Sequence, residues 1–381
     1  CGTVFSVRSP CLRSKRGDLN SYEFPFFYFS LLLYSCQKMV LMKIQSVQRY
    51  TPFTQQRGVK VLIPNSSFAV VIYPTYLVFT HFAKSSTGSI RFAHSAAFKH
   101  ITVQLDLEHG CITVWGESDR SYFRYHLYAH EERLLFYLQK GDLEFSIEGN
   151  DVEVCRAKPV IPIRSVERLS LGVHKKQEWP LMSQRADPQE IVPFLYALGQ
   201  WTDNSLPSNL NQGSLSLVNS LLPPDFESHF QDFFRLAFHS DGLFYPTLKD
   251  EGGWGFNLPP VEESTHSFHL AAYLYQHLRS LLFVSQEHQM QFLPYLPKDF
   301  HCGRLINLQT ESAILDMEWS KKVIRRVVIR AKRDAEVNLH FRHVKTMRLR
   351  RSRTERAAQM DVNNSLKLKE GSVYFLDNFQ K

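Results

Sequence analysis

The stretch that decides the fold is VERLSLGVHKKQEWPLMSQRADPQEIVPFLYALGQW, residues 166–201. Before it, short apolar and β-branched runs alternate with turn-forming residues, a pattern typical of antiparallel strands. After it, apolar residues recur at helical spacing, and beyond residue 300 the strand pattern returns. The sequence therefore predicts a multidomain β + α protein. It has an N-terminal antiparallel β-sandwich over residues 42–165, a junction and short helical middle over 166–300, and a C-terminal antiparallel β-domain over 301–381.

The second half of this stretch carries the signals of a helix start. Asp187 can cap the helix, Pro188 fits its first position, and Glu190 follows at the spacing of a capping box. The helix is predicted to end near Gly199. Its apolar residues at helical spacing are Ile191, Phe194, Leu195 and Leu198. Upstream, the alternation over residues 166–173 predicts one further strand.

The middle of the stretch gathers side chains that could hold a ligand. The candidate ligand-binding residues are His174, Lys175, Lys176, Gln177 and Trp179, together with Trp254 from a later loop. Basic, amide and aromatic groups at a domain junction suit an anionic or sugar ligand in a cleft. The same groups suit packing and salt bridges between the sandwich and the helices, and both interpretations stay open.

Carboxylates in and after the stretch are candidates for acid–base chemistry. The candidate catalytic residues are Asp187, Glu251 and Glu263, the last two in or next to the glycine- and proline-rich loop 239–260. Two carboxylates at a suitable distance are what glycoside hydrolysis requires. Helix capping and surface positions are the alternative roles. Two further helices are predicted here, Pro224–Phe238 with Asp225 as its cap and Glu263–Glu287.

Metal and nucleotide motifs are missing from the sequence. His266 and His269 have the i, i+3 spacing of two metal ligands, but no HExxH motif and no third ligand accompany them. The chain also has no Walker loop, no G-x-G-x-x-G and no G-x-S-x-G. We therefore expect no metal and no cofactor.

The region before the stretch contains nine short runs of β-type residues separated by turn formers. These runs are Val59–Ile63, Phe68–Tyr73, Tyr76–Phe82, Ile90–His94, Ile101–Leu107, Cys111–Trp115, Tyr122–Tyr128, Leu134–Leu138 and Leu143–Ile147. Residues 101–117 predict a hairpin with His109-Gly110 as a two-residue turn. Trp115, Tyr122 and Tyr128 could stack on a sugar ring, or they could pack in the core or at an edge.

Charge and cysteine usage limit the partners and the compartment. The chain has 381 residues, a formal net charge of +8 and one dense basic tract, His343–Arg356. That tract is a solvated loop or hairpin tip in one interpretation, and a surface for nucleic acid or protein in another. A charge of this size over so long a chain argues against nucleic acid as the main partner. The six cysteines are widely spaced, which favours a reducing, cytoplasmic location.

The first 41 residues differ in texture from the rest. Residues 24–36 (FPFFYFSLLLYSC) form an apolar run that is shorter than the about 20 residues needed to span a bilayer. Met39 and Met42 follow directly, and a sequence of ordinary globular composition begins there. We expect residues 1–41 to be a non-native or leader extension. A membrane would be a partner only if residues 24–36 act as a signal or anchor.

The C-terminal strands carry a set of motifs in a fixed order. They are Leu293-Pro294-Tyr295-Leu296-Pro297, then Lys298-Asp299, Gly303, Leu315-Asp316-Met317-Glu318-Trp319 and Val328-Ile329-Arg330-Ala331-Lys332. This region resembles the C-terminal region of bacterial inverting 1,2-α-L-fucosidases and related glycoside hydrolases with an (α/α)6 barrel. The resemblance covers about 50 residues and implies the same order of parts: sandwich, helical part and β-domain.

Two departures limit what the resemblance implies. The glycine-rich segment of that family is replaced by NLQTES, residues 307–312, and the helical part is too short for a complete barrel. No catalytic residue of the family has a counterpart here, so none is carried over. The expected function is a bacterial-type protein that recognises carbohydrate, or serves as structure, without hydrolysing glycosides. The alternatives are an active glycoside hydrolase with an altered site and a module that binds nucleic acid or protein through residues 343–356. The expected partner is a carbohydrate or anionic ligand, and a protein partner stays open.

Overall fold

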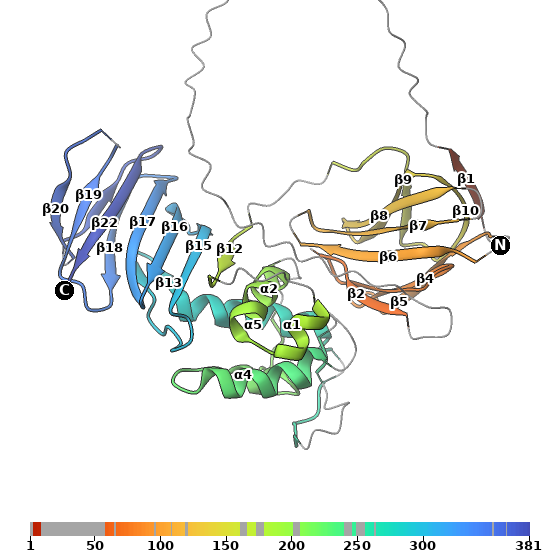
Figure 1. Cartoon of the computed structure of the whole chain (residues 1–381), viewed down its shortest axis with the longest axis horizontal. Helices are drawn as coiled ribbons and strands as arrows, with labels where there is room; N and C mark the ends of the chain where they lie inside the picture. The colour runs from red at the N-terminus through yellow and green to blue at the C-terminus, as the bar shows by residue number, and fades with distance from the viewer. Residues whose placement is uncertain are drawn as a thin grey trace, which may run out of the picture.

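The computed structural model describes most of the chain after residue 57. The described residues are 3–8, 58–64, 66–94, 97–107, 109–118, 121–160, 166–172, 179–200, 206–239, 246–248, 256–262, 264–352, 354–362 and 364–381, with the main chain alone for 3–8, 179, 180 and 239. Figure 1 shows a small helical part between two β-domains built largely of antiparallel strands. The predicted fold class is confirmed.

Most of the predicted extension 1–41, including the apolar run Phe24–Cys36, lies outside the described residues. Its described segment is strand β1 (Thr3–Arg8), which pairs antiparallel with β10 (Asp142–Glu148) at the edge of a sheet. Among the described helices, none combines the length and the apolar character needed to cross a bilayer.

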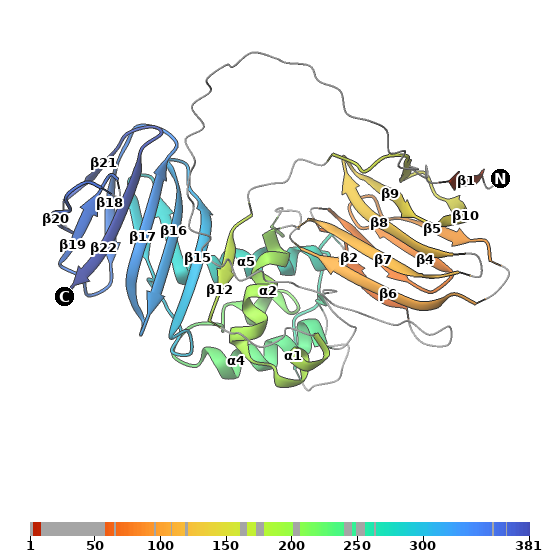
Figure 2. The same cartoon turned by 45° about the horizontal axis from the view of Figure 1, so that its top comes forward.

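The N-terminal domain stacks two sheets (Figure 2). Its other strands are β2 (Val59–Leu62), β3 (Phe68–Ile72), β4 (Tyr76–His81), β5 (Ser86–Phe92), β6 (Lys99–Asp106), β7 (Cys111–Glu117), β8 (Tyr122–His130), β9 (Arg133–Lys140) and β11 (Val152–Cys155). The six-stranded sheet has the order β1-β10-β5-β4-β3-β2, and the five-stranded sheet has the order β11-β9-β8-β7-β6. All nine predicted strands are present. The pair β11–β9 is parallel, unlike its neighbours.

Strands β6 and β7 form the predicted hairpin. Ile101, Val103 and Leu105 are buried on one face, as their alternation predicted. The predicted two-residue turn is wrong, because the last paired residues are Asp106 and Cys111, so that residues 107–110 connect the strands. The Asp106 carboxylate stabilises this longer turn by accepting the main-chain N–H of His109 at 3.0 Å.

The described part of the helical middle contains four helices besides the short α3. They are α1 (Trp179–Arg185), α2 (Pro188–Gln200), α3 (Leu215–Val218), α4 (Phe226–Phe234), which continues into a π-helical turn η1 (Arg235–His239), and α5 (Ser267–Leu282). Helix α2 confirms the helix predicted after Asp187, whereas α1 and α3 were not predicted. Asp225 precedes α4 as expected but makes no side-chain capping hydrogen bond.

Helix α5 is shorter at both ends than the predicted range Glu263–Glu287. Its last predicted residues form strand β13 (Phe283–Gln286), which pairs with β14 (Gln289–Phe292). Strand β14 in turn pairs with the distant β18 (Ala335–Phe341). The main-chain groups after Leu282 therefore find their hydrogen-bond partners in a sheet, and a segment far away in sequence decides where the helix ends.

Gly199 lies inside α2, which ends at Gln200, so the glycine does not have the terminating role predicted for it. A Cβ atom at this position would lie 2.3 Å from the carbonyl oxygen of Ala271 and 2.4 Å from the Cβ of Tyr275, both in α5. The main chains of α2 and α5 approach so closely that a larger residue would force the helices apart. The glycine is therefore a packing residue between two helices.

The C-terminal domain also stacks two sheets. Its remaining strands are β12 (Arg168–Ser170), β15 (Cys302–Gln309), β16 (Ala313–Ser320), β17 (Val323–Ala331), β19 (Thr346–Arg350), β20 (Ala358–Asp361), β21 (Leu366–Leu368) and β22 (Val373–Gln380). The seven-stranded sheet has the order β12-β15-β16-β17-β22-β19-β20, and the four-stranded sheet has the order β13-β14-β18-β21. Strands β12, β13 and β14 thus join these sheets although they precede residue 301.

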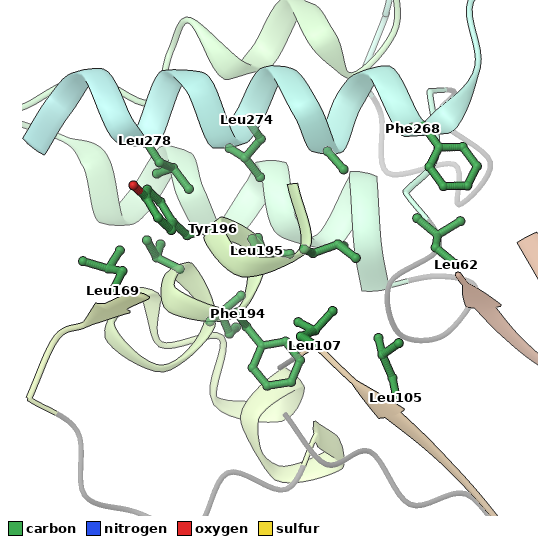
Figure 3. Packing of buried hydrophobic residues seen from close by; sticks show 14 of the residues in the cluster. Leu62, Leu105, Leu107, Leu169, Phe194, Leu195, Tyr196, Phe268, Leu274 and Leu278 are labelled. Atoms are coloured by element: carbon green, nitrogen blue, oxygen red, sulfur yellow. The ribbon is translucent and has the colours of Figure 1, made fainter. Parts of the chain in front are cut away.

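One hydrophobic core runs through all three parts of the described structure. Figure 3 shows how it crosses from the sandwich to the helices. Leu62 of β2 lies beside Phe268 of α5, and Leu107 after β6 lies beside Phe194 of α2. Phe82 also packs edge-on against Phe268, with ring centroids 5.6 Å apart. Buried aromatic and aliphatic side chains therefore hold the sandwich against the helices.

The buried His81 and the half-buried His277 predict a loss of stability in mild acid. Burial lowers the pKa of His81 and of His277 below the ordinary value of 6.5. The unfolded chain therefore binds protons at these two histidines at a higher pH than the folded chain does. The free energy of unfolding is therefore largest above about pH 6.5 and decreases as the pH falls below that value. We expect denaturant unfolding to give a lower free energy at about pH 5.5 than at about pH 7.5. The variant His81→Phe should show a weaker pH dependence, and an unchanged pH dependence would contradict the assignment.

Candidate functional site

Most of the candidate ligand-binding and catalytic residues lie outside the part of the chain that the structure describes. His174, Lys175, Lys176 and Gln177 are outside it, as are Glu251, Trp254 and Glu263. Trp179 is the first residue of α1, and only its main chain is described. The structure therefore leaves the predicted cluster and two of the three predicted catalytic carboxylates as predictions.

Asp187, the third catalytic candidate, lies at the N-terminus of α2. Its Oδ1 accepts the main-chain N–H of Gln189 at 2.9 Å, which is a capping interaction. Glu190 in the first turn is fully buried and accepts two hydrogen bonds from Arg185, at 2.8 and 2.6 Å. Both carboxylates thus have structural partners, which agrees with the capping role left open for Asp187.

A buried carboxylate that the sequence did not single out lies at the centre of the junction. Glu167 is 4% exposed and accepts hydrogen bonds from four groups. The donors are the hydroxyls of Tyr196 (2.5 Å) and Tyr275 (3.2 Å), Nε of Arg279 (3.2 Å) and the main-chain N–H of Gln309 (3.0 Å). These donors come from α2, α5 and β15, so one carboxylate ties two helices to the C-terminal sheet.

Burial and neighbouring charges fix the protonation states of the groups around Glu167. Burial, together with the Glu167 charge, raises the pKa of the Tyr196 and Tyr275 hydroxyls, so both stay protonated as donors. Burial alone would lower the pKa of Arg279, but the charge of Glu167 raises it above its ordinary value. Arg279 also donates from Nη2 to the carbonyl oxygen of Gln309 at 2.7 Å. The junction is therefore a saturated structural network, since its donors and acceptors are engaged within the protein.

His266, which directly precedes α5, and His269 in the first turn of α5 lie where the sandwich meets the helices. The rings of His266 and His269 stack with centroids 3.9 Å apart, and Phe82 and Phe268 pack around His266. Within the described ranges, no group of three or more His, Cys, Asp or Glu side chains could hold a metal ion. The pair therefore takes part in an aromatic contact between domains.

The outer face of the five-stranded sheet presents a row of polar and aromatic side chains. Thr113, His126 and Tyr137 lie opposite one another on β7, β8 and β9. His126 Nδ1 lies 3.0 Å from the Thr113 hydroxyl, and its Nε2 lies 3.0 Å from Oε1 of Gln139. Burial lowers the pKa of His126. A neutral ring therefore donates to Gln139 and accepts from Thr113, and both Tyr128 and Tyr137 stack on it at 6.0 Å.

A second row on this face centres on an arginine. Arg124 on β8 lies opposite Trp115 on β7, and its guanidinium lies 5.6 Å from the Trp115 ring centroid and 5.8 Å from that of Tyr122. Its Nε is buried and makes no hydrogen bond within the described part of the chain. Stacking between two rings fixes the guanidinium plane, which leaves its outer N–H groups oriented for a partner.

We call these residues the sandwich face: Thr113, Trp115, Tyr122, Arg124, His126, Tyr137 and Gln139. Flat aromatic surfaces beside oriented hydroxyl, amide, imidazole and guanidinium groups suit a ligand that has apolar C–H faces and many hydroxyls. The sequence left two roles open for Trp115, Tyr122 and Tyr128, stacking on a sugar ring or packing in the core or at an edge. Alternation along β8 places Arg124 and His126 on one face. Tyr128 differs, because it is 4% exposed and packs with Cys111 and Leu135.

The basic tract His343–Arg356 forms β19 and the connection to β20, so the hairpin interpretation holds for its described residues. Arg348 and Arg350 both donate to the carboxylate of Asp377 on the neighbouring strand β22. At the tip, the main-chain N–H of Arg351 donates to Glu355 at 2.7 Å. Part of the positive charge of the tract is therefore used within the sheet.

No family model matches the chain, and no curated protein matches it.

Proposed function

We propose that this protein recognises carbohydrate through the sandwich face and is a reduced, non-hydrolytic relative of the 1,2-α-L-fucosidase-type glycoside hydrolases. The observation that carries the proposal is the arrangement of Trp115, Arg124 and His126. Each side chain is half-buried and is fixed by stacking or hydrogen bonds, yet it belongs to the outer face of the sheet. Fixed groups of this kind lose little conformational entropy when a ligand binds.

The order of the domains supports the proposed relationship. In both the chain and the enzymes it resembles, a sandwich precedes a helical part and a C-terminal β-domain follows. Trp319, the last residue of the Asp-Met-Glu-Trp motif, is 1% exposed and donates from Nε1 to the carbonyl oxygen of Phe300. A motif whose tryptophan packs in the core has a structural role. This role supports a relative that has the β-domains of these enzymes without their (α/α)6 barrel.

The absence of hydrolysis is part of the proposal. The described carboxylates of the junction have structural partners: Glu167 binds four donors, Glu190 binds Arg185, and Asp187 caps α2. A general acid needs a free proton and a general base needs a free lone pair close to the scissile bond. We also propose a cytoplasmic location, supported by six widely spaced cysteines.

The variant Trp115→Ala should lose most of the carbohydrate affinity. A glycan array of neutral and acidic oligosaccharides identifies the ligand of the full chain, and calorimetry then compares the variants with it. We expect Trp115→Ala to weaken binding at least about tenfold, or about 1.4 kcal/mol, because the stacking surface and the support for Arg124 are both lost. Tyr295→Ala is the matched control, since this aromatic residue is 59% exposed but lies in the Leu-Pro-Tyr-Leu-Pro segment.

Two results would contradict the proposal. One is an array on which the folded chain binds no glycan. The other is a bound glycan whose affinity Trp115→Ala leaves unchanged. Release of sugar from a bound glycan would show instead that the chain is an active hydrolase, and loss of that activity in Glu251→Gln or Glu263→Gln would identify its carboxylates.

A further inference from the structure

The positive charge of this protein is concentrated in its C-terminal domain. Residues 301–381 contain 18 Lys and Arg against 9 Asp and Glu, whereas residues 1–300 contain 27 against 28. The whole net charge of +8 therefore comes from the last 81 residues. A segregation of this kind creates a local positive potential that the total charge conceals.

Three of these arginines lie in one line across the outer face of the seven-stranded sheet. On each of the seven strands, one residue lies opposite a residue of the neighbouring strand, and together these residues form a single row across the whole sheet. The row is Ser170, Arg304, Glu318, Arg326, Asp377, Arg348 and Gln359, taken in strand order from β12 to β20. We call it the arginine row. Its arginines stand on alternate strands, and its carboxylates stand between them.

The carboxylates hold the arginines in position. Arg304 lies 3.4 Å from Glu318, and Arg348 lies 3.0 Å from Asp377. Arg326 lies between these two carboxylates in the register and is exposed. Beside the row, Arg330 makes two hydrogen bonds of 2.7 Å to Asp316. The guanidinium groups keep N–H donors on their outer side, because a carboxylate occupies only part of the fork.

The spacing along the row is regular. Neighbouring strands lie about 4.8 Å apart, so the three arginines recur at intervals of about 10 Å. In Figure 2 the seven strands lie side by side in one layer, with the four-stranded sheet on one side of it. The row therefore offers regularly spaced cations that alternate with hydrogen-bond acceptors.

This alternation distinguishes between two kinds of polyanion. Duplex DNA carries about one negative charge per 1.7 Å, so Glu318 and Asp377 would face phosphates wherever it lay along the row. Single strands bind on aromatic stacking platforms, and Phe375, the aromatic residue next to the row on β22, is only half-exposed. An acidic polysaccharide differs, because carboxylate or sulfate groups alternate with hydroxyls along a stiff chain. The arginines of the row can pair with the carboxylate or sulfate groups of the polysaccharide. Glu318 and Asp377 can accept hydrogen bonds from its hydroxyls.

We propose that the arginine row binds an acidic polysaccharide laid across the strands of the seven-stranded sheet. This site is distinct from the sandwich face, at the opposite end of the molecule (Figure 1). The proposal would stand even if the sandwich face bound nothing. It gives the chain a second carbohydrate-binding surface, one that selects for negative charge.

The experiment uses the full chain and end-labelled polygalacturonate, with labelled dextran as the neutral polymer and a short DNA duplex as the other polyanion. Fluorescence anisotropy should show binding to polygalacturonate that weakens as salt is added, and no binding to dextran. We expect the duplex to bind at least about tenfold more weakly at the same salt concentration. The triple variant Arg304→Gln, Arg326→Gln, Arg348→Gln should lose at least about tenfold in affinity for polygalacturonate.

A control variant separates the row from general charge. Arg133→Gln removes an exposed arginine of the sandwich, paired with Glu153 at 3.3 Å, and should bind like the parent chain. If the triple variant fails to fold, the single variant Arg326→Gln serves, with an expected loss of about threefold.

Three results would overturn the proposal. The first is that the folded chain does not bind polygalacturonate. The second is that the duplex binds as tightly or more tightly, which would make nucleic acid the partner of the C-terminal domain. The third is that the folded triple variant, or Arg326→Gln in its place, binds polygalacturonate like the parent.

Discussion

Glu167→Ala should destabilise the folded chain by about 3–5 kcal/mol, because it removes one partner of a buried ion pair. Arg279 would keep its charge in a largely buried site, and the hydroxyls of Tyr196 and Tyr275 would lose their acceptor. An uncompensated buried cation and unsatisfied donors both add to the cost. Urea unfolding of the variant and the parent chain at the same pH measures the difference in free energy.

A matched pair of conservative variants shows that burial is the cause. Glu167→Gln keeps the size of the side chain but loses its charge, and should still destabilise the chain markedly. Glu318→Gln makes the same change at a carboxylate that is 42% exposed and lies 3.4 Å from Arg304, and should cost less than about 1 kcal/mol. Equal effects at the two positions would refute the assignment of Glu167 as the structural centre of the junction.

Trp319→Ala should cost about 3–5 kcal/mol, because it empties the space of the largest fully buried side chain among the described residues. The indole lies so close to the main chain of β15 that a Cβ atom at Gly303 would lie 2.2 Å from its Cζ2 atom. The strands can pack in this way because Gly303 has no side chain and the indole ring of Trp319 on the neighbouring strand is flat. Removal of the ring therefore leaves a cavity that the rigid sheet cannot close.

A second substitution at this position separates packing from hydrogen bonding. Trp319→Phe keeps most of the apolar volume but loses the Nε1–H that donates to the Phe300 carbonyl oxygen at 3.1 Å. We expect it to cost about 1–3 kcal/mol, less than the alanine variant. Tyr295→Ala, at an exposed aromatic residue, should stay within about 0.5 kcal/mol of the parent. Thermal unfolding provides the comparison, and an alanine variant as stable as the phenylalanine variant would contradict the packing argument.

The β-strands could be predicted from local sequence because alternation along a strand reports directly which face is buried. Ile101, Val103 and Leu105 are all buried on one face, as their spacing indicated. The start of α2 was equally local, since Asp187 caps the helix through the main chain two residues later. The hairpin turn after β6 was placed wrongly because a His-Gly pair suggests a short turn, whereas the side chain of Asp106 stabilises a longer one.

The Glu167 network and the arginine row could not be predicted from the sequence, because their residues come together only in the tertiary structure. Glu167 looked like an ordinary polar residue of a strand, and its donors come from positions 196, 275, 279 and 309. The arginine row joins seven strands that are spread between residues 168 and 380, and only the register of each pair aligns them. Register is set by packing of the inner faces, so a sequence that reveals each strand still does not reveal its neighbour.

The opening stretch 166–201 shows the same division within itself. By itself the sequence determined that a strand is followed by a capped helix, because alternation, a capping carboxylate and a proline are local signals. The tertiary structure decided that β12 is the edge strand of the C-terminal sheet and that Glu167 ties α2 and α5 to it. It also decided that Gly199 lets two helices meet. These roles depend on the partner that each residue contacts, and main-chain and carboxylate groups accept partners from any part of a chain that folding brings within hydrogen-bond distance.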